Sequence, residues 1–516
     1  MRNSGSRFLN PLITIIVLGA VVWTGTQLFD DLRAFTGHSA LAYVLLGVAL
    51  TIALGFEFVN GFHDTANAVA TVIYTRSLPA NVAVVWSGAW NLTGVLVSSG
   101  VVAFGIISLL PVELILQVGS AAGFAMVFAL LIAAIIWNLG TWWLGLPSSS
   151  SHTLIGSVIG VGLMNQLMGG ADGTSGVDWS QATKIGYSLL ASPAFGFILA
   201  ALLLLALKSL VRAPELYRAP NGHQPPPFWI RSLLILTCTG VSFFHGSNDG
   251  QKGMGLIMLI LIGIAPTAYA LNRSMNEDQI QTFIAISDRA ATTISRYAAG
   301  PAPAPYREEV TRYIETRQLD PGTMAAELEL AKSIRDQVAG FQSIAGIPRD
   351  QVGNVRNDMY LADDALRFMK KSGAPAFTAE DQAVIDAYRD QLDTATRFIP
   401  LWVKVAVAIA LGMGTMIGWK RIVVTVGEKI GKDHLTYAQG AAAEIVAMVC
   451  IGAADGLGLP VSTTHVLSSG VAGTMAANGS GLQWSTVRSL AMAWILTLPV
   501  SIALSGGLFW IFRHTF

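Results

Sequence analysis

The chain alternates long apolar stretches with short polar connections, and this pattern predicts a bundle of membrane-spanning helices. A helix needs about 20 apolar residues to cross the hydrocarbon core of a bilayer. Stretches close to or beyond that length recur at 8–29, 39–75, 82–109, 121–146, 151–168, 185–207, 232–266, 399–419, 437–456, 460–477 and 487–512. We therefore expect an all-α polytopic membrane protein with about 11 membrane segments.

One region breaks this pattern. Between Asn272 and Arg397 the hydropathy collapses, and this stretch holds 19 of the 32 acidic and 15 of the 32 basic residues. Apolar residues recur there with helical spacing, as in MAAELELAKSIRDQVAGF, which is typical of surface helices with one apolar face. The sequence predicts a small helical soluble insert.

Basic residues in the short loops predict the orientation, because positively charged loops tend to stay in the cytoplasm. They gather at the N-terminus, in the loop between Lys208 and Arg231, and between Lys420 and Lys432. The order of the spans puts all three on one side, which we take as cytoplasmic, and puts the insert and the C-terminus on the other.

Composition supports a membrane protein and excludes other classes. Only 12% of residues are charged, about half the usual share of a soluble domain. A formal net charge of zero gives no field for nucleic acid. Cys238 and Cys450 lie in apolar stretches and suggest neither a disulfide framework nor a zinc site. We expect no cofactor, no protein-bound metal and no catalytic residues.

Two motifs occur twice, in the order A, B, A′, B′. The segment NGFHDTANA at 60–68 aligns with HGSNDGQKG at 245–253, and GLPSSSSHT at 145–153 aligns with GLPVSTTHV at 458–466. Asp64 and Pro147 are 83 positions apart, whereas Asp249 and Pro460 are 211 apart. The excess of 128 is about the length of the insert, so the insert interrupts the second copy only.

Each copy contains an odd number of predicted crossings, so the second copy enters the membrane from the opposite face. Such inverted repeats bring equivalent broken helices or re-entrant hairpins together near the midplane of the bilayer. The expected domains are an extra transmembrane segment at 1–35, a first repeat at 36–210, a polar loop at 211–229, the start of the second repeat at 230–270, the insert at 271–398 and the rest of the second repeat at 399–516.

The first motif of each copy places polar side chains inside apolar segments, where an isolated charge is costly and normally faces a cavity or a partner. The flanking glycines would let the helix unwind and expose carbonyls to a cation. The coupling-cation candidates are Asp64, Asn248, Asp249, Lys252 and Glu444. Asp249 and Lys252, at helical i,i+3 spacing, form an alternative structural ion pair.

The second motif resembles a helix N-terminus, since a proline is followed by hydroxyl residues at the start of an apolar run. Free backbone N–H groups at such an end attract anions, although serines there also serve helix packing. The candidate substrate contacts are Ser148, Ser149, Ser150, Ser151, Ser462, Thr463, Thr464, Asn67 and Gln251.

At NGFHDTANAVATVIYTR, WNLGTWWLGLPSSSSHTLIG, HGSNDGQKGMGLIMLILIG and GLPVSTTHVLSSGVAGTM, the chain resembles the PiT family of inorganic phosphate transporters, in its bacterial low-affinity, proton-coupled branch. The resemblance implies phosphate uptake across the cell inner membrane, driven by H+ or Na+ symport, with phosphate often carried as a neutral complex with a divalent metal. Some relatives carry sulfate. The expected partners are phosphate and the lipid bilayer, with a homodimer left open.

Two other classes compete with this interpretation. An intramembrane hydrolase would need a nucleophile such as Ser149 within reach of a base such as His152, but an asymmetric catalytic site has no need of both copies. An anion channel would need a continuous pore rather than two opposed motifs.

Overall fold

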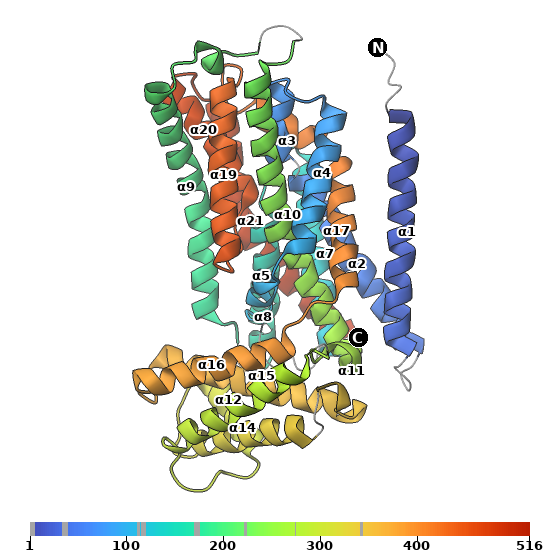
Figure 1. The fold of residues 1–516 in the computed structure, drawn as a ribbon, viewed down its shortest axis with the longest axis vertical. Coiled ribbons are helices and arrows are strands. Elements are labelled where there is room, and N and C mark those ends of the chain that lie inside the picture. Colours follow the sequence, from blue (N-terminus) through green and yellow to red (C-terminus); the bar gives the residue numbers. More distant parts are fainter. Residues whose placement is uncertain are drawn as a thin grey trace.

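The computed structural model describes residues 6–33, 40–64, 66–110, 114, 120–169, 176–220, 224–273, 275–340 and 344–515. Within these ranges the regular secondary structure is helical, connected by turns and loops, with one isolated β-bridge between Gly431 and Leu482. Figure 1 shows a long helical bundle with a separate layer of helices at one end. The helix α1 (Ser6–Arg33) stands at the side of the bundle, against α17.

The first repeat contains seven described helices. It comprises α2 (Ala40–Asp64), α3 (Ala66–Tyr74), α4 (Ala80–Val97), α5 (Val101–Ile107), α7 (Ala121–Trp143), α8 (Ser150–Gly169) and α9 (Trp179–Leu210). A loop with the short 3₁₀ helix η1 (Pro214–Tyr217) then leads to the second repeat.

The second repeat has the same order of elements in the opposite direction. It comprises α10 (Phe228–Ile264), α17 (Leu401–Met416), α18 (Lys420–Glu428), α19 (Tyr437–Gly456), α20 (Thr463–Asn478) and α21 (Trp484–Thr515). The copies interlock, because α10 packs on α4 while α17 packs on α2, and α20 packs on α9 while α21 packs on α8. The inverted repeat expected from the sequence is therefore present.

Two pairs of predicted crossings form hairpins instead. The residues before α19 and after α20 are neighbours, since Lys432 N donates to Gly481 O at 3.1 Å and Gln483 N to Ile430 O at 2.9 Å. Figure 1 shows α19 turning back before it reaches the insert. The equivalent hairpin, α7 and α8, enters from the insert end. The expected count of 11 segments is thus not confirmed, and seven described helices are long and apolar enough to cross a membrane, or eight with one bent pair.

The expected unwinding at the second acidic motif is wrong. The helix α10 runs without a break through HGSNDGQKG, and its glycines serve close packing. A Cβ atom on Gly246 would lie 2.1 Å from Asn91 O, and one on Gly94 would lie 2.0 Å from Phe243 O. These contacts let the backbones of α4 and α10 touch, which small residues allow in membranes. In the first copy, α2 and α3 lie on either side of residue 65, which is outside the described residues.

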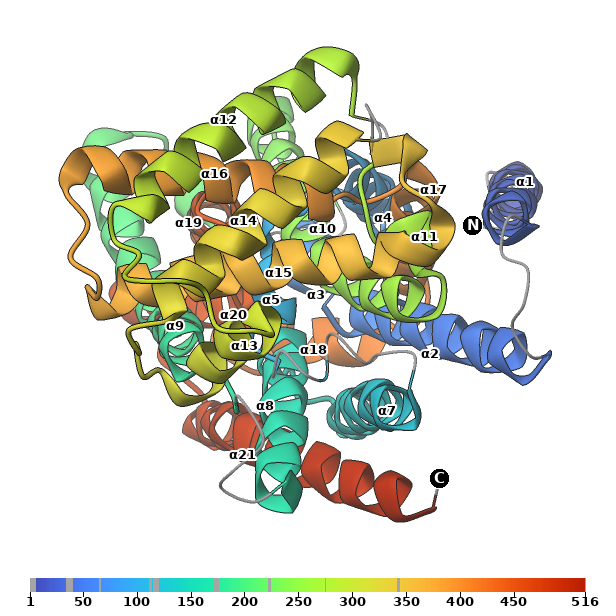
Figure 2. The same cartoon turned by 90° about the horizontal axis from the view of Figure 1, so that it is seen from below.

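The insert is a layer of amphipathic helices across one end of the bundle, as Figure 2 shows from that end. After α11 (Pro266–Tyr269) it contains α12 (Glu277–Ser295), α13 (Tyr306–Thr316), α14 (Thr323–Gly340), η2 (Ile344–Gly346), α15 (Arg349–Ser372) and α16 (Ala379–Thr396). Its buried residues, such as Phe283, Leu330 and Met359, continue the apolar cluster of the membrane helices.

Ion pairs fix the insert to the start of α9. Asp178, the N-cap of α9, lies 3.0 Å from Arg367 and 3.2 Å from Lys371 of α15. Burial raises the pKa of Asp178, but the charge of Arg367 and hydrogen bonds from Ser180 and Gln181 lower it more, so the pKa lies below its ordinary value. The insert is therefore anchored to the first repeat, although it interrupts the second.

Candidate functional site

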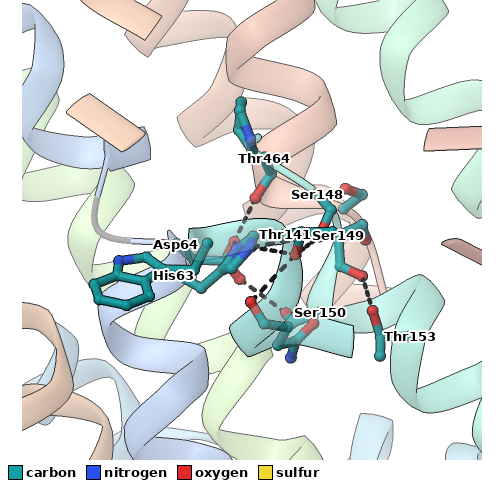
Figure 3. A network of polar contacts seen from close by, with 12 residues as sticks. His63, Asp64, Thr141, Ser148, Ser149, Ser150, Thr153 and Thr464 are labelled. Carbon is teal, nitrogen blue, oxygen red and sulfur yellow. Dashed lines mark hydrogen bonds and ion pairs between the residues drawn. The ribbon is translucent and has the colours of Figure 1, made fainter. Parts of the chain in front are cut away.

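Asp64 lies where the two hairpins meet, and it accepts a hydroxyl from each of them. Ser150 Oγ of α8 donates to Asp64 Oδ2 at 2.8 Å, and Thr464 Oγ1 of α20 donates to Asp64 Oδ1. Figure 3 shows these contacts converging on one carboxylate. All three side chains are buried, so the two hydroxyl-rich segments are brought together around a charge of the first motif.

The hairpin tips also touch each other directly. Ser151 Oγ donates to Val461 O at 2.8 Å, and the rings of His152 and His465 lie 4.6 Å apart. Both α8 and α20 begin at this contact, so the N-termini of two antiparallel helices face each other. Ser462 caps α20 by accepting a hydrogen bond from His465 N. The expected pair of helix N-termini is thus observed.

The first acidic motif holds the first hairpin through His63. His63 Nε2 lies 3.1 Å from Thr141 Oγ1 and 3.4 Å from Ser148 Oγ, and these two hydroxyls are 2.9 Å apart. The other ring nitrogen, Nδ1, is 3.5 Å from Asp64 Oδ1. His63 therefore connects the tip of the α7–α8 hairpin to the central carboxylate.

The second motif holds the second hairpin in the equivalent way. Asn248 Nδ2 donates to Leu459 O at 3.1 Å, and Asn248 Oδ1 accepts from Val461 N at 3.4 Å. Gln251 Nε2 donates to Asp455 Oδ1 at 2.8 Å. Asn248 and Gln251, expected to bind a cation and the substrate, thus contact the tip of the α19–α20 hairpin.

Asp249 is the second central carboxylate, and its two oxygens face different groups. Oδ1 forms an ion pair with Lys252 Nζ at 2.7 Å, so the structural ion pair considered for these residues is present. Oδ2 lies 3.4 Å from both Ser150 Oγ and His245 Nε2. Asp64 and Asp249 are joined through Ser150 and differ in one respect, since Asp64 has no lysine or arginine partner among the described contacts.

The site combines buried hydrogen-bond donors with charges that partly cancel. Two helix N-termini supply N–H groups and a positive dipole end, which suit an oxyanion. The carboxylates beside them would repel an anion unless a cation or a proton accompanied it. The arrangement therefore suits an anion that moves together with positive charge.

Some predicted site residues lie elsewhere. Glu444 accepts hydrogen bonds from Thr71 and Thr237, and none of the described contacts joins it to Asp64 or Asp249. Asn67 is the second residue of α3, and its side chain lies outside the described residues. Thr463 is buried beside the site, yet its neighbour Thr464 is the residue that donates to Asp64.

Sequence reasoning missed two side chains. Asp455 accepts a hydrogen bond from Ser247 Oγ at 2.7 Å as well as from Gln251. Asp455 lies at the end of an apolar run, three positions before the repeated Gly-Leu-Pro sequence. The residue at the equivalent position of the first copy is Trp142. His245 opens the second motif and faces both central carboxylates. Comparing the two copies position by position would have singled out both residues.

One contact required by the hydrolase alternative, between a serine hydroxyl and a histidine ring, is present. Ser149 Oγ lies 2.8 Å from His152 Nδ1, but the same oxygen also accepts from His152 N at the start of α8. The serine therefore caps the helix. His152 stacks beside His465, and no described carboxylate contacts its ring to complete a catalytic triad.

Comparison with known proteins gives one consistent result. Residues 60–505 match the model of the phosphate transporter family. The chain is 42% identical over 498 residues to the low-affinity inorganic phosphate transporter PitB of Escherichia coli (strain K12), covering 93% of this chain and 99% of that protein. It is 42% identical over 499 residues to PitA of the same organism, with the same coverage.

More distant proteins are also similar over most of this chain. A probable low-affinity inorganic phosphate transporter of Bacillus subtilis (strain 168) is 26% identical over 475 residues, covering 92% of this chain and 99% of that protein. A solved structure, described as the sodium-dependent phosphate transporter, matches with a TM-score of 0.50 at 19% identity. It covers 92% of this chain and 100% of that one, and it supports the fold.

Proposed function

The chain belongs to the phosphate transporter family, and we propose that it takes up inorganic phosphate by proton symport through alternating access to one site between the two hairpin tips. Phosphate transport itself follows from the family and from the similarity to PitA and PitB. The chain is a multi-pass membrane protein and a transporter rather than an enzyme. The coupling ion, the access mechanism and the inner membrane as its location are the proposed parts.

One observation carries the proposal of a shared site. A single carboxylate, Asp64, accepts hydroxyl donors from both hairpins. A phosphate placed between Ser150 and Thr464 would take over these donors and those of the two helix N-termini. A tetrahedral oxyanion has enough acceptors to engage both helices at once. Because the hairpins enter from opposite ends, moving either one would open the site to one side only.

The proton is favoured as the coupling ion by the imidazoles around Asp64. His63 Nδ1 is 3.5 Å from Asp64 Oδ1, within a buried set of hydroxyls. Histidine is the side chain whose charge ordinarily changes near neutral pH. A proton bound to this pair would offset the negative charge that phosphate brings into the site. We assign proton coupling to Asp64 with His63.

The site model is tested by phosphate binding to the purified protein with Ser150→Ala, Thr464→Ala and the double variant. Losing one hydroxyl contact to a charged ligand should weaken binding about ten- to hundredfold. The double variant should weaken it by less than the product of the two effects, because both residues touch one ligand. Ser468→Ala is the control, since Ser468 is buried one turn further along α20 and its Oγ has no described hydrogen bond. Two phosphates per chain, each lost in one variant only, would refute a shared site.

Proton coupling is tested by uptake into proteoliposomes with pH and sodium gradients imposed separately. We expect accumulation of labelled phosphate with an inward proton gradient alone. Accumulation that follows only the sodium gradient would remove the proton from the proposal but leave phosphate transport in place.

The membrane orientation is tested by cysteine labelling in a chain without its two native cysteines. A cysteine at Arg218, in the loop between α9 and α10, should be protected from a reagent outside the cell, and one at Gly340, in the insert, should react. Figure 1 places these two regions at opposite ends. The reverse labelling pattern would invert the proposed direction of uptake.

A further inference from the structure

A cavity of about 600 Å³ lies between the start of α18 and the tip of the first hairpin. Its lining combines three tryptophans with three cations, namely Trp142, Trp143, Trp419, Lys420, Arg421 and Lys429. Asp64, Ser150 and Thr464 are not among the described residues that line it, so this cavity is separate from the proposed phosphate site. Its positive charge has no part in the proposed transport step.

The three cations of this cavity have no acidic partner among the ion pairs of the described residues. Glu428 is the acidic residue closest to them in the sequence, and its carboxylate accepts the hydroxyl of Tyr74 at 2.7 Å. Arg421 is held by two rings, because its guanidinium lies 5.1 Å from the centroid of Trp142 and 4.6 Å from that of Trp143. Positioned cations without a counter-charge attract a negatively charged group.

The same cavity has an exposed apolar wall. Trp143, Leu144 and Ile417 line it and are 65%, 70% and 56% exposed. In a membrane protein such side chains face lipid, since contact with water would be unfavourable. A second cavity of about 480 Å³ shares Leu144 with the first and extends between α7 and α21, where Trp137 and Met492 line it. The wall therefore offers a path for an acyl chain beside the cations.

The cavity lies in the half of the bundle opposite the insert. The helix α18 packs on α3, and Figure 1 places α3 towards that end. The last residues of these two helices, Tyr74 and Glu428, are hydrogen-bonded, so Lys429 lies at the end of the bundle. At 1.5 Å per residue, Lys420 lies up to about 13 Å deeper. The positive charges thus extend from the polar surface to the depth at which acyl chains begin.

We propose that this cavity binds the phosphate group of an anionic phospholipid, whose acyl chains lie against Leu144 and Ile417. Basic pockets between membrane helices bind such headgroups. An inorganic phosphate would pair with the same cations, but it would gain nothing from the exposed apolar wall. A phospholipid satisfies both parts of the lining, and the bilayer supplies it at a high local concentration.

The bound lipid contacts both α18 and the tip of the first hairpin. Trp142 Nε1 donates to Gly418 O at 2.8 Å, and Arg421 Nη1 donates to Trp143 O at 2.8 Å. These hydrogen bonds already join the two segments that form the cavity. A phospholipid between them adds a further link and stabilises the arrangement in which the hairpin rests on α18. The lipid composition of the membrane thereby acts on one of the two hairpins of the transport site.

The direct test is native mass spectrometry of the purified full chain, titrated with phosphatidylglycerol or with phosphatidylcholine of the same acyl chains. The parent should bind the first phosphatidylglycerol about tenfold more tightly than phosphatidylcholine. Each cation near the membrane surface contributes a factor of about five to the binding of an anionic lipid, so the double variant Lys420→Gln with Lys429→Gln should bind phosphatidylglycerol about 25-fold more weakly. This variant keeps Arg421 and its contacts with the hairpin.

Lys208→Gln is the matched control, since Lys208 is exposed at the same end of the bundle, in the last turn of α9, and does not line the cavity. It should bind phosphatidylglycerol like the parent. An equal loss of affinity in Lys208→Gln and in the double variant would overturn the inference, because the cavity would then add nothing to the general charge of this surface. Equal affinities of the parent for the two lipids would overturn it as well.

Two further probes distinguish a lipid site from a site for free anions. The headgroup without its acyl chains, glycerophosphoglycerol, should bind at least about 100-fold more weakly than the whole lipid. Inorganic phosphate should displace no more lipid than chloride of equal ionic strength does. Specific displacement by inorganic phosphate would overturn the inference and make the cavity a site for the free anion. A parent that takes up no phosphate would refute the proposed function but leave this lipid site intact.

Hydrogen exchange tests the effect of the lipid on the hairpin. Phosphatidylglycerol should slow exchange at the hairpin tip, 143–146, and at the start of α18, 417–421, in the parent. The same lipid concentration should leave exchange in the double variant almost unchanged. Unchanged exchange in the parent with lipid bound would overturn the stabilisation of the hairpin.

Discussion

The two copies place the same backbone elements at the site, but their side chains differ in kind. In the first copy Phe62 packs on Trp142 with ring centroids 5.0 Å apart, and at the equivalent positions of the second copy Ser247 donates to Asp455. His63 of the first copy corresponds to Asn248 of the second. The repeat thus sets positions, whereas the substitutions between copies make the two sides chemically distinct.

This difference extends to the two ends of the pathway. Beyond the first hairpin tip lies a cavity of about 600 Å³ lined by Trp142, Trp143, Lys420, Arg421 and Lys429 among others. Arg421 donates to Trp143 O and Thr425 to Gly145 O, so α18 holds this tip. Beyond the second tip lie Asp455 and the insert. A basic and aromatic cavity at the first tip and a carboxylate, Asp455, at the second make the two ends chemically different although the backbone is symmetric.

The largest expected effect separates the two central carboxylates. Asp64→Asn should lower the rate of phosphate uptake by about 100-fold or more, the usual size of the loss when a proton-transferring side chain is removed, and should destabilise the fold less than Asp249→Asn, since Asp64 has no lysine or arginine partner among the described contacts. Asp249→Asn should also destabilise the fold by about 3–5 kcal/mol, since it leaves Lys252 buried without its partner. Uptake in proteoliposomes and thermal unfolding measure the two effects.

A second substitution distinguishes these outcomes. Adding Lys252→Met to Asp249→Asn should restore stability without restoring uptake. If Asp249→Asn proves as stable as the parent, the ion pair is not structural and the distinction between the two copies at this position fails.

A smaller effect on the uptake rate is expected when His63 of the first copy is replaced by asparagine, the residue at the equivalent position of the second copy. His63→Asn should slow uptake about tenfold, because the shorter side chain loses the contact of Nε2 with Thr141 and Ser148, worth about 1 kcal/mol or slightly more. His63→Gln, whose amide reaches nearly as far as Nε2, should retain most of the rate but lose its dependence on pH. Equal rates and pH profiles in all three proteins would exclude His63 from coupling.

The insert offers the next comparison, since it belongs to one copy and is fixed to the other. Asp178→Asn should weaken its docking by about 1–2 kcal/mol, the range of a charge-assisted hydrogen bond near a surface. A carboxyl with a lowered pKa contributes stability above its ordinary pKa of about 3.9, and this is lost as the pH falls through the lowered value. Hydrogen exchange of α15 should therefore distinguish parent from variant at pH 7 and converge in acid. Persistence of the difference at pH 2 would contradict the ion-pair explanation.

The smallest effect concerns Glu327, inside the insert. Neither of its carboxylate oxygens has a described hydrogen bond, and burial, then the charge of Asp363, raises its pKa well above the ordinary value. The folded state binds this proton more tightly, so stability is present at low pH and is lost as the pH rises above about 4.3, the ordinary pKa of glutamate. Glu327→Gln should stabilise the insert by about 1 kcal/mol at pH 8 and by nothing at pH 4.

No tryptophan lies within 271–398, so hydrogen exchange of α14 is a better measurement for Glu327→Gln than intrinsic fluorescence. Glu329→Gln is a matched control, because Glu329 is partly exposed and its described ion pair is with Lys332. A stabilisation of equal size in both variants would show that charge alone, and not burial, is responsible.

The sequence predicted the repeat, the hydroxyl-rich helix ends and Asp64 as a central charge, because these depend on local residue order and on a duplication that can be read directly. It could not predict that α10 stays continuous, since glycine permits both unwinding and close packing, and the choice depends on neighbours from distant segments, such as Asn91 and Val95 of α4 and Glu57 of α2. Nor could it show that Thr464 rather than Thr463 reaches Asp64. That depends on how the α20 helix is rotated against α2, which no single segment specifies.

The facing N-termini of α8 and α20 have a consequence for how selectivity and energy coupling are divided. Their N–H groups belong to the backbone, so no protonation, metal removal or side-chain substitution abolishes their attraction for an anion. The ability to bind an oxyanion is therefore a property of the backbone fold. Any dependence of transport on pH must then arise in the few side chains around these helix ends, and such side chains can differ between relatives without loss of the anion site.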